Sequence, residues 1–291
     1  MSATGGSIRR RTFLAIATCS LLAATGGSWA ASTTTSAAAT PTIVSIEWHD
    51  GNRDSIGALR ILTAHAMHAT WLVNTDPILA GNPANLTPKQ LQRIETTGNE
   101  VGGHTLDHVN VQPLPVDEAR REVCDDRNNL LDMGLHPTTF AYPFASFDAG
   151  SEDVVHYCNY NDASATAGLT LKGPAANTVP PADPYAVRTV NAIKKSTKLA
   201  TMERYVANAE AFAQANGSAW VVFVFHHLCD KGVKCGPYVV SPAKFADFLT
   251  YLQGQAANGV VVQTMAGVSG GAVKPACDPV SGAGCDTSPR P

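Results

Sequence analysis

Short apolar segments alternate with helical segments from residue 42 to residue 264, and this alternation constrains the fold more than any other feature. Several apolar segments, such as 219–225, are hydrophobic on both faces. Strands of this kind form parallel sheets whose two faces are covered by helices. About 230 residues are enough for one such α/β domain, either a small or irregular β/α barrel or an open doubly wound sheet.

The expected elements follow from hydrophobic periodicity and from helix end signals. We expect a sheet of about seven strands, drawn from eight candidate segments: 42–48, 69–73, 100–103, 138–143, 162–166, 186–190, 219–225 and 259–264. We expect helices at 54–67, 87–97, 116–133, 151–158, 198–215 and 241–255. Thr87 and Pro88 supply an N-cap and a first-turn proline for the second helix, and Gly134 ends the third. No glycine-rich phosphate loop follows a strand, which disfavours a nucleotide site.

Both ends of the chain differ in composition from the domain. Residues 1–30 have the features of an export signal: three arginines at 9–11, a short apolar run, and a small-x-small cleavage site at 28–30. The arginines resemble a twin-arginine signal, an ordinary secretory signal being the alternative, and the run is too short for a membrane anchor. We therefore expect a secreted or periplasmic protein with a linker at 31–41, one domain at 42–269, and a Gly/Pro/Cys tail at 270–291 outside the fold.

Charge and cysteine content narrow the possible partners. The chain has 21 Lys and Arg residues against 24 Asp and Glu residues, with no basic stripe, so we expect no nucleic acid partner. We also expect a monomer. Of the seven cysteines, Cys19 lies in the predicted signal, and the others are an even number suited to an oxidising compartment. We expect three disulfides, which join Cys124 to Cys158, Cys229 to Cys235, and Cys277 to Cys285.

Reactive side chains gather where the predicted strands end, which is the functional edge of a parallel sheet. They are Asp50, His104, His108, Tyr142, Pro143, Phe144, Arg188, His226 and His227. On a helical turn, His104 and His108 would face the same way, and Asp50 would complete a set of two imidazoles and one carboxylate. Such a set leaves coordination positions open, as in a catalytic metal site.

These motifs resemble, in order, those of the polysaccharide deacetylase family, carbohydrate esterase family 4. His49-Asp50-Gly51 stands at the family's Asp-Asp-Gly, Gly102-Gly103-His104 to His108 matches its histidine motif, and Ala141-Tyr142-Pro143-Phe144 stands at its Arg-x-Pro-Tyr. Arg188 lies at a later, looser motif, and Val224-Phe225-His226 matches its Leu-x-His. The resemblance implies a distorted β/α barrel that removes N- or O-acetyl groups from glycans with a bound divalent metal, usually zinc.

The resemblance also implies a role for each matched residue. Asp50, His104 and His108 are similar to the metal ligands, His226 to the acid that protonates the leaving group, and Tyr142 to a residue whose backbone N–H holds the oxyanion. Pro143, Phe144 and Arg188 would contact substrate. His226 is expected to face the pocket and His227 is not, because successive strand residues point to opposite sides.

Two positions depart from the family pattern. The general base aspartate is replaced by His49, and the arginine that steadies it by Ala141. His49 is then the base, a fourth metal ligand, or the mark of a protein that only binds metal and glycan. A metal hydrolase acting on another amide or ester is a further alternative. We expect an active deacetylase with an acetylated substrate resembling chitin, peptidoglycan or xylan.

Overall fold

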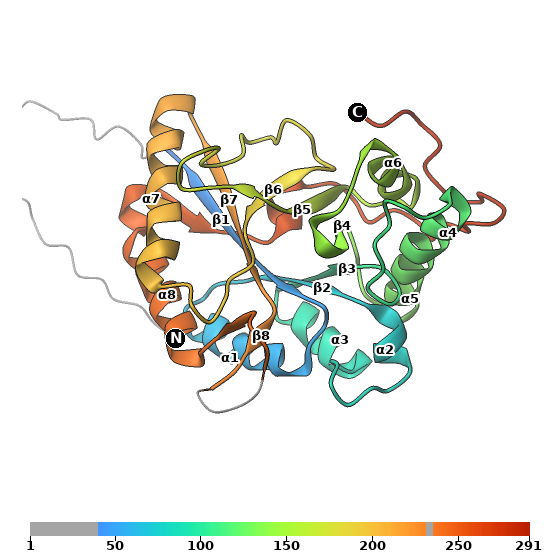
Figure 1. The fold of residues 1–291 in the computed structure, drawn as a ribbon, viewed down its shortest axis with the longest axis horizontal. Coiled ribbons are helices and arrows are strands. Elements are labelled where there is room, and N and C mark those ends of the chain that lie inside the picture. The colour runs from blue at the N-terminus through green and yellow to red at the C-terminus, as the bar shows by residue number, and fades with distance from the viewer. Residues whose placement is uncertain (1–39, 231–234) are drawn as a thin grey trace, which may run out of the picture. The chain divides into compact units, whose positions relative to one another are not determined.

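The structure is a computed structural model that describes residues 40–230 and 235–291 (Figure 1). The predicted export signal and nearly all of the predicted linker lie outside the described residues. Ten strands are found in the described part of the chain: β1 (Thr42–His49), β2 (Thr70–Val73), β3 (Glu100–Gly103), β4 (Thr139–Ala141), β5 (Asp162–Leu169), β6 (Val187–Val190), β7 (Ala219–Phe225), β8 (His227–Leu228), β9 (Val239–Val240) and β10 (Val260–Val262).

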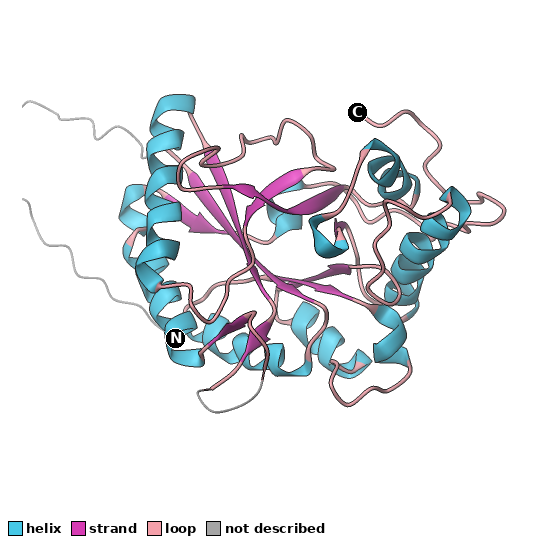
Figure 2. Ribbon diagram, in the orientation of Figure 1, coloured by secondary structure: helices cyan, strands magenta, loops and turns pink. Residues whose placement is uncertain are grey.

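Helices connect most of these strands and cover the sheet (Figure 2). They are α1 (Ile56–Ala64), α2 (Thr75–Leu79), α3 (Pro88–Thr96), α4 (Val116–Arg120), α5 (Asp126–Asp132), α6 (Ala149–Tyr157), α7 (Leu199–Asn216), α8 (Pro242–Gly254) and α9 (Met265–Ser269). Short 3₁₀ turns lie at Arg53–Ser55, Pro143–Ala145 and Ala256–Asn258, and a π turn lies at Arg121–Asp125. In the described part of the chain, no helix is both long enough and apolar enough to cross a membrane.

The sheet is parallel and curls back on itself. β1 pairs with β7 over almost its whole length, with β10 along its first half and with β2 along its second half. The order then runs from β2 through β3, β4 and β5 to β6. A backbone bridge between Asn177 and Trp220 and a hydrogen bond from Ile193 N–H to the Val224 carbonyl (2.9 Å) link the segments around β6 to β7. The fold is therefore the expected distorted β/α barrel, and the open doubly wound alternative is wrong.

Side-chain alternation along β1 separates two environments. Val44, Ile46 and Trp48 point outward into the main hydrophobic core, which they share with α1, α7 and α8. Ser45, Glu47 and His49 fall on the other face, where Ser45 Oγ accepts a hydrogen bond from the Trp220 indole N–H at 2.9 Å. The barrel interior is therefore polar beneath the carboxyl end of β1, and its polar groups must find partners there.

The residues expected to begin and end helices do so in the structure. Thr87 and Gln90 form a reciprocal capping box at the start of α3, behind the first-turn Pro88. The helix predicted at 116–133 is present as α4 and α5, joined by an unpredicted π turn, and Gly134 follows it with φ 77°. The short elements α2, α9, β8 and β9 are not predicted by the sequence, since segments of two to five residues carry little periodic signal.

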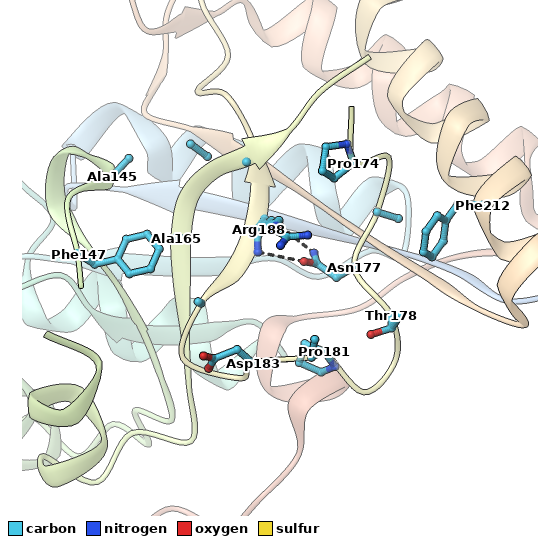
Figure 3. A pocket seen from close by; sticks show the side chains of 15 residues that line it. Ala145, Phe147, Ala165, Pro174, Asn177, Thr178, Pro181, Asp183, Arg188 and Phe212 are labelled. Atoms are coloured by element: carbon cyan, nitrogen blue, oxygen red, sulfur yellow. Dashed lines mark hydrogen bonds between the residues drawn. The ribbon is translucent and has the colours of Figure 1, made fainter. Parts of the chain in front are cut away.

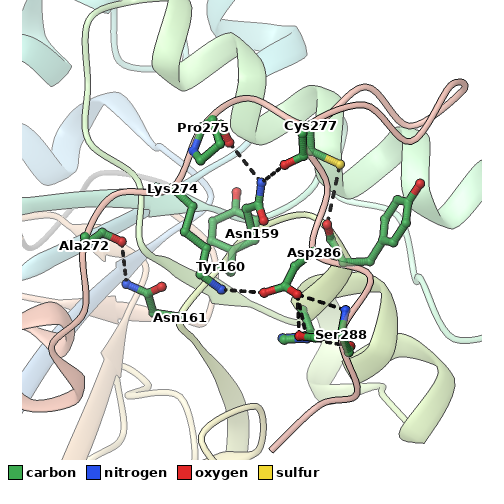
Figure 4. A network of polar contacts seen from close by, with 12 residues as sticks. Asn159, Tyr160, Asn161, Ala272, Lys274, Pro275, Cys277, Asp286 and Ser288 are labelled. Carbon is green, nitrogen blue, oxygen red and sulfur yellow. Dashed lines mark hydrogen bonds and ion pairs between the residues drawn. The ribbon is translucent and has the colours of Figure 1, made fainter.

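The C-terminal segment packs against the barrel, contrary to the expectation that it lies outside the fold. The three expected disulfides are present: Cys124–Cys158, Cys229–Cys235 and Cys277–Cys285. Cys277 is fully buried beside the first of these. Figure 4 shows the polar contacts that hold the segment, among them Asn159 Nδ2 to the Pro275 carbonyl (3.0 Å) and Lys274 Nζ to Asp286 Oδ2 (3.0 Å).

Candidate active site

Asp50 lies at the carboxyl end of β1, where the backbone turns sharply. Asp50 and Gly51 both have left-handed φ values, 69° and 66°. An unbranched polar residue tolerates this conformation better than most, and Gly51 tolerates it without strain. Two amides hold the turn, since Asn52 Nδ2 donates to Asp50 Oδ2 (3.3 Å) and Asn85 Nδ2 donates to the Asp50 carbonyl (3.3 Å). The turn directs the carboxylate across the barrel mouth.

His104 and His108 follow β3 in an irregular loop, and the helical turn expected for them is wrong. Thr105 and His108 have left-handed φ values, 71° and 68°, which reverse the chain twice within five residues. The two rings nevertheless lie together, with centroids 5.0 Å apart. The spacing therefore predicts the pairing of the side chains, although the backbone reaches it by another route.

Hydrogen bonds from three elements fix this loop. The buried Asp126 on α5 accepts the His104 backbone N–H (3.0 Å) through Oδ2 and the Thr75 N–H (3.1 Å) through Oδ1. The Asn74 side chain donates to the His104 and Thr105 carbonyls. The Leu106 N–H donates to the Glu122 carbonyl (3.1 Å), which belongs to the π turn between α4 and α5. Such a turn frees a carbonyl from the helix and is common at functional sites.

The glycines that precede His104 allow neighbouring groups to approach the strand closely. A Cβ atom on Gly102 would meet the Thr139 carbonyl of β4, and one on Gly103 would meet the Tyr160 hydroxyl and the Asp126 carboxylate. Gly103 therefore makes room for the carboxylate that anchors the His104 backbone.

Asp50, His104 and His108 converge with the spacing of a tetrahedral metal site. Asp50 Oδ1 lies 3.5 Å from His104 Nε2 and 3.4 Å from His108 Nε2. Ligands ~2.1 Å from a tetrahedral zinc are ~3.4 Å from one another. Burial alone would raise the pKa of Asp50, but the two neighbouring histidines outweigh burial and lower it below its usual value. The carboxylate is therefore charged and ready to bind a cation.

The tautomer of His104 also suits a metal. His104 Nδ1 lies 2.7 Å from the Ala141 carbonyl, which can only accept, so Nδ1 carries a proton. In the neutral ring, the Nε2 lone pair then faces Asp50 Oδ1, which is itself buried without a hydrogen-bond partner among the described residues. Two acceptors that face each other fit a cation between them, and a backbone carbonyl behind the ring is the usual outer support of a histidine ligand.

His49 lies beneath this set, inside the barrel, and is paired with Glu47. His49 Nε2 is 2.9 Å from Glu47 Oε2, which also accepts the Ser164 hydroxyl (3.0 Å). Both residues are almost completely buried. Burial lowers the pKa of His49, helped by His104 and His226, and burial raises the pKa of Glu47. His49 also lines the cavity above it, so its ring connects the buried carboxylate to the mouth of the barrel.

His226 and His227 separate as the strand geometry predicts. His226 lines the cavity that Asp50, His104 and His108 also line, which is called the metal-site cavity below. The centroid of its ring lies 5.4 Å from that of His49 and 5.2 Å from that of Tyr238. Burial lowers the pKa of His226 to about 4, and its buried Nδ1 has no hydrogen-bond partner among the described residues. His227 starts β8 and pairs through Nδ1 with Asp54 Oδ2 (2.9 Å) outside that cavity.

The four expected substrate and oxyanion residues occupy different places. Tyr142 lines the cavity, but its backbone N–H donates to the Ser164 carbonyl (3.2 Å), so the sheet already occupies the group expected to hold the oxyanion. Pro143 is buried and lines neither the metal-site cavity nor its neighbour, contrary to the expected substrate contact. Phe144 is 66% exposed and packs edge-on against His108, with centroids 4.5 Å apart. Arg188 lines the neighbouring cavity.

The metal-site cavity has a volume of about 620 Å³. Besides the residues expected from the sequence, it is lined by Thr166, Asn191, Lys194 and Tyr238. These residues lie in or after β5, β6 and β8, outside any spacing that predicts chemistry. Thr166, Asn191 and Lys194 have only one signal in the sequence, which is that each lies at or near a predicted strand end. Tyr238 lies near none, and Glu47 likewise lacks a motif of its own.

Part of the chain is similar to a known family of proteins. Residues 36–163 match the family model described as polysaccharide deacetylase. Over these residues, which are less than half of the chain, the sequence is similar to the polysaccharide deacetylase family, as the motifs indicated. The match includes Asp50, His49 and both loop histidines and ends at the start of β5, before Arg188 and His226. A search of curated proteins gave no significant match.

Several of the solved structures that this chain matches are deacetylases. One is the Streptococcus pyogenes deacetylase PplD in complex with acetate, with 24% identity over 42% of this chain and 55% of that chain, at a TM-score of 0.41. A family 4 acetyl xylan esterase from Clostridium thermocellum with a cobalt ion has 18% identity over 77% and 88% of the two chains, at 0.49. Peptidoglycan deacetylase PdaC from Bacillus subtilis has 17% identity over 76% and 87%, at 0.47.

Proposed function

We propose that the protein is an exported, zinc-dependent hydrolase that removes acetyl groups from a polysaccharide. The observation that carries this proposal is the convergence of Asp50, His104 and His108 at tetrahedral separations beside a cavity large enough for a sugar unit. The family match over residues 36–163 supports the same class of reaction. Two imidazoles and one carboxylate leave positions for water and for the acetyl oxygen.

A zinc ion held by these three side chains would polarise the acetyl carbonyl and make water acidic enough to attack at neutral pH. We assign the role of general base to His49. Its Nε2 is engaged by Glu47, which leaves Nδ1 as the ring nitrogen available towards the cavity. In this role Nε2–H donates to the Glu47 carboxylate, which orients the ring and stabilises the imidazolium that forms.

We assign the second proton transfer to His226. Its lowered pKa means that the ring is neutral at neutral pH, so it does not store a proton before the reaction. The proton that it delivers to the leaving nitrogen or oxygen must therefore reach His226 during the turnover, from the attacking water by way of the His49 imidazolium, whose ring centroid lies 5.4 Å away. We assign the oxyanion role expected for Tyr142 to the backbone N–H of Phe144, a residue that also lines the cavity and has a left-handed φ of 61° directly after Pro143.

Acetate release from a panel of acetylated glycans tests the function. Zinc-loaded protein should release acetate from at least one of a chitin-like oligomer, peptidoglycan or acetylated xylan, and chelated protein should release none. His104→Ala should weaken zinc binding by ~100-fold or more and abolish release. His136→Ala, at a 68% exposed histidine paired with Glu95, is the matched control and should change neither. Zinc binding without acetate release from any glycan would contradict the proposal.

A further inference from the structure

A second cavity, of about 610 Å³, lies beside the metal-site cavity and shares Ala145 and Ala167 with it. Figure 3 shows that its labelled side chains come from the Pro143–Ala145 turn and the loop after it, from β5, β6 and α7, and from the segment that precedes β6. Most of the wall consists of alanine, proline and phenylalanine. Arg188, at the middle of this wall, is its only cationic side chain.

The structure around Arg188 fixes its position on β6. Arg188 N–H donates to Asn177 Oδ1 (3.0 Å) and its carbonyl accepts from Asn177 Nδ2 (2.8 Å) (Figure 3). Asn177 is itself bridged to Trp220 of β7. The aliphatic part of the side chain crosses Gly168 of β5, where an added Cβ would lie 3.0 Å from Arg188 Cγ. Hydrogen bonds with Asn177 therefore hold the Arg188 backbone on one side, and Gly168 leaves room for the Arg188 side chain on the other.

No acidic side chain that lines the two cavities pairs with either of their two cationic side chains, Arg188 and Lys194. Apart from histidines, the charged side chains that line the two cavities are Asp50, Asp183, Arg188 and Lys194. Asp50 faces the two metal-site histidines, and Asp183 pairs with Arg290 at 3.1 Å. Within residues 40–230 and 235–291, no ion pair or side-chain hydrogen bond engages the Arg188 guanidinium, and Lys194 lies over the Tyr238 ring at 5.3 Å.

We propose that the Arg188 cavity is a subsite for a sugar unit that carries a carboxylate, next to the unit that loses its acetyl group. A guanidinium binds a carboxylate through two parallel hydrogen bonds, and the alanine and proline wall packs against the C–H face of a sugar ring. The carboxylate could belong to a uronic acid or to a lactyl ether on a hexosamine, and both present the same group to Arg188. The inference rests on the proposed function in one respect, since it names the class of glycan on which that function would act.

Binding to the zinc-free full-length protein tests the subsite without requiring activity. Two ligands are titrated by calorimetry: an N-acetylated hexosamine oligomer with free lactyl carboxylates, and an acetylated xylan oligomer with uronic acid groups. Each is compared with the same oligomer after reduction of its carboxyl groups to alcohols. At least one charged ligand should bind about 10- to 100-fold more tightly than its reduced form, which is the effect of a charged hydrogen bond. The ligand that shows the difference identifies the source of the carboxylate.

Substitutions test whether Arg188 causes the difference in affinity between the charged and the reduced ligands. Arg188→Gln should remove the preference for the charged ligand, Arg188→Lys should retain part of it, and Arg93→Gln, at an exposed arginine on α3, should retain all of it. Equal binding of charged and reduced ligands by the wild-type protein would overturn the subsite, and so would a preference that survives Arg188→Gln but disappears in Lys194→Gln. Acetate release is measured separately with zinc-loaded protein, so absence of activity with retained carboxylate selectivity would refute the function and leave the subsite standing.

Discussion

At the scale of the residue, the polar face of β1 combines three groups that a strand normally buries only when they are satisfied. Ser45 accepts from Trp220, Glu47 accepts from Ser164, and His49 is bound to Glu47. The remaining Glu47 oxygen, Oε1, has no hydrogen-bond partner among the described residues. Leaving a buried carboxylate oxygen unsatisfied is costly, which is typical of a group retained for function rather than for stability.

Glu47→Gln tests whether Glu47 positions His49. The amide keeps the shape and an acceptor for His49 Nε2–H, but it cannot stabilise a cationic ring, so kcat should fall by ~10- to 100-fold with little change in KM. The ¹⁵N shifts of the His49 ring in zinc-free protein should show less Nε2–H tautomer than in wild type. Glu47→Asp should restore part of the activity. An unchanged kcat in Glu47→Gln would rule out the positioning role.

The lowered pKa of His226 gives a second prediction. An NMR titration of zinc-free protein should find His226 neutral above about pH 5, because its pKa is about 4, and cationic only below that range. The ring would then lack a stored proton at neutral pH, and His226→Ala should lower kcat by ~10²- to 10⁴-fold while zinc affinity is retained. His227→Ala, which removes the partner of Asp54, is the control and should change kcat much less. A larger loss in His227→Ala would reverse the assignment.

The sequence predicts which residues form this site better than it predicts the hydrogen bonds between them and their neighbours. Asp50 and His226 are found because they end strands, and His104 and His108 because their spacing brings the two rings together. Glu47 carries no such signal, since its role depends on the ring of His49 turning down into the barrel. The Tyr142 N–H, which is expected to hold the oxyanion, instead donates to the Ser164 carbonyl of β5. The sequence does not reveal this hydrogen bond.

At the scale of the element, the hydrophobic pattern predicts the strands and the longer helices closely. A long helix buries one continuous apolar stripe, and a strand of this sheet buries both of its faces, so each leaves a clear pattern in the sequence. It does not predict the π turn at Arg121–Asp125, since a helix with one wide turn has nearly the same periodicity as a regular one. This turn supplies a carbonyl to the histidine loop, so the unpredicted feature is also the one that supports the site.

Gly103→Ala tests the close packing behind the histidine loop. The added methyl would collide with the Tyr160 hydroxyl and the Asp126 carboxylate, so the strand or Asp126 must move. We expect a loss of ~1–3 kcal/mol in the free energy of unfolding, together with weaker zinc binding. Gly254→Ala on α8, where an added Cβ meets no atom within 4 Å, is the matched control. Equal stability of the two variants in chemical denaturation would contradict this account of the Gly102-Gly103 pair.

At the scale of the whole molecule, the C-terminal segment completes the barrel on the side of α5 and α6. Arg127 on α5 is completely buried, and its guanidinium donates to the Pro275 carbonyl (2.8 Å) and the Lys274 carbonyl (2.7 Å). Near the end of the chain, Arg290 pairs with Asp153 (3.3 Å) and Asp183 (3.1 Å). The glycine and proline content of 270–291 indicates a tail, but it does not show that buried donors of the barrel depend on this segment.

Removal of residues 270–291 should therefore destabilise the barrel. The Arg127 guanidinium would lose both carbonyl acceptors, and leaving a buried charge unsatisfied costs about 3–5 kcal/mol. The truncated protein should unfold at a lower denaturant concentration or fail to fold. Arg127→Leu in the full-length chain removes the buried charge instead, so combining it with the truncation should lower stability by less than the truncation alone. If truncation has the same effect with and without the Arg127→Leu substitution, the segment does not serve Arg127.

Asp286 makes the attachment of this segment sensitive to acid. Hydrogen bonds from Ser288, followed by those from Lys274, lower the pKa of Asp286 to about 2. The ordinary pKa of an aspartate is ~3.9, so the native state favours the charged form, and the added stability is complete above pH ~4 and disappears as the pH falls towards 2. Asp286→Asn should therefore lower the melting temperature at pH 6, and the difference from wild type should shrink at pH 2.5. The Val280→Ala variant, at an 89% exposed position of the same segment, should show no pH-dependent difference. A deficit in Asp286→Asn that stays constant from pH 6 to pH 2.5 would show that the carboxylate charge does not hold the segment.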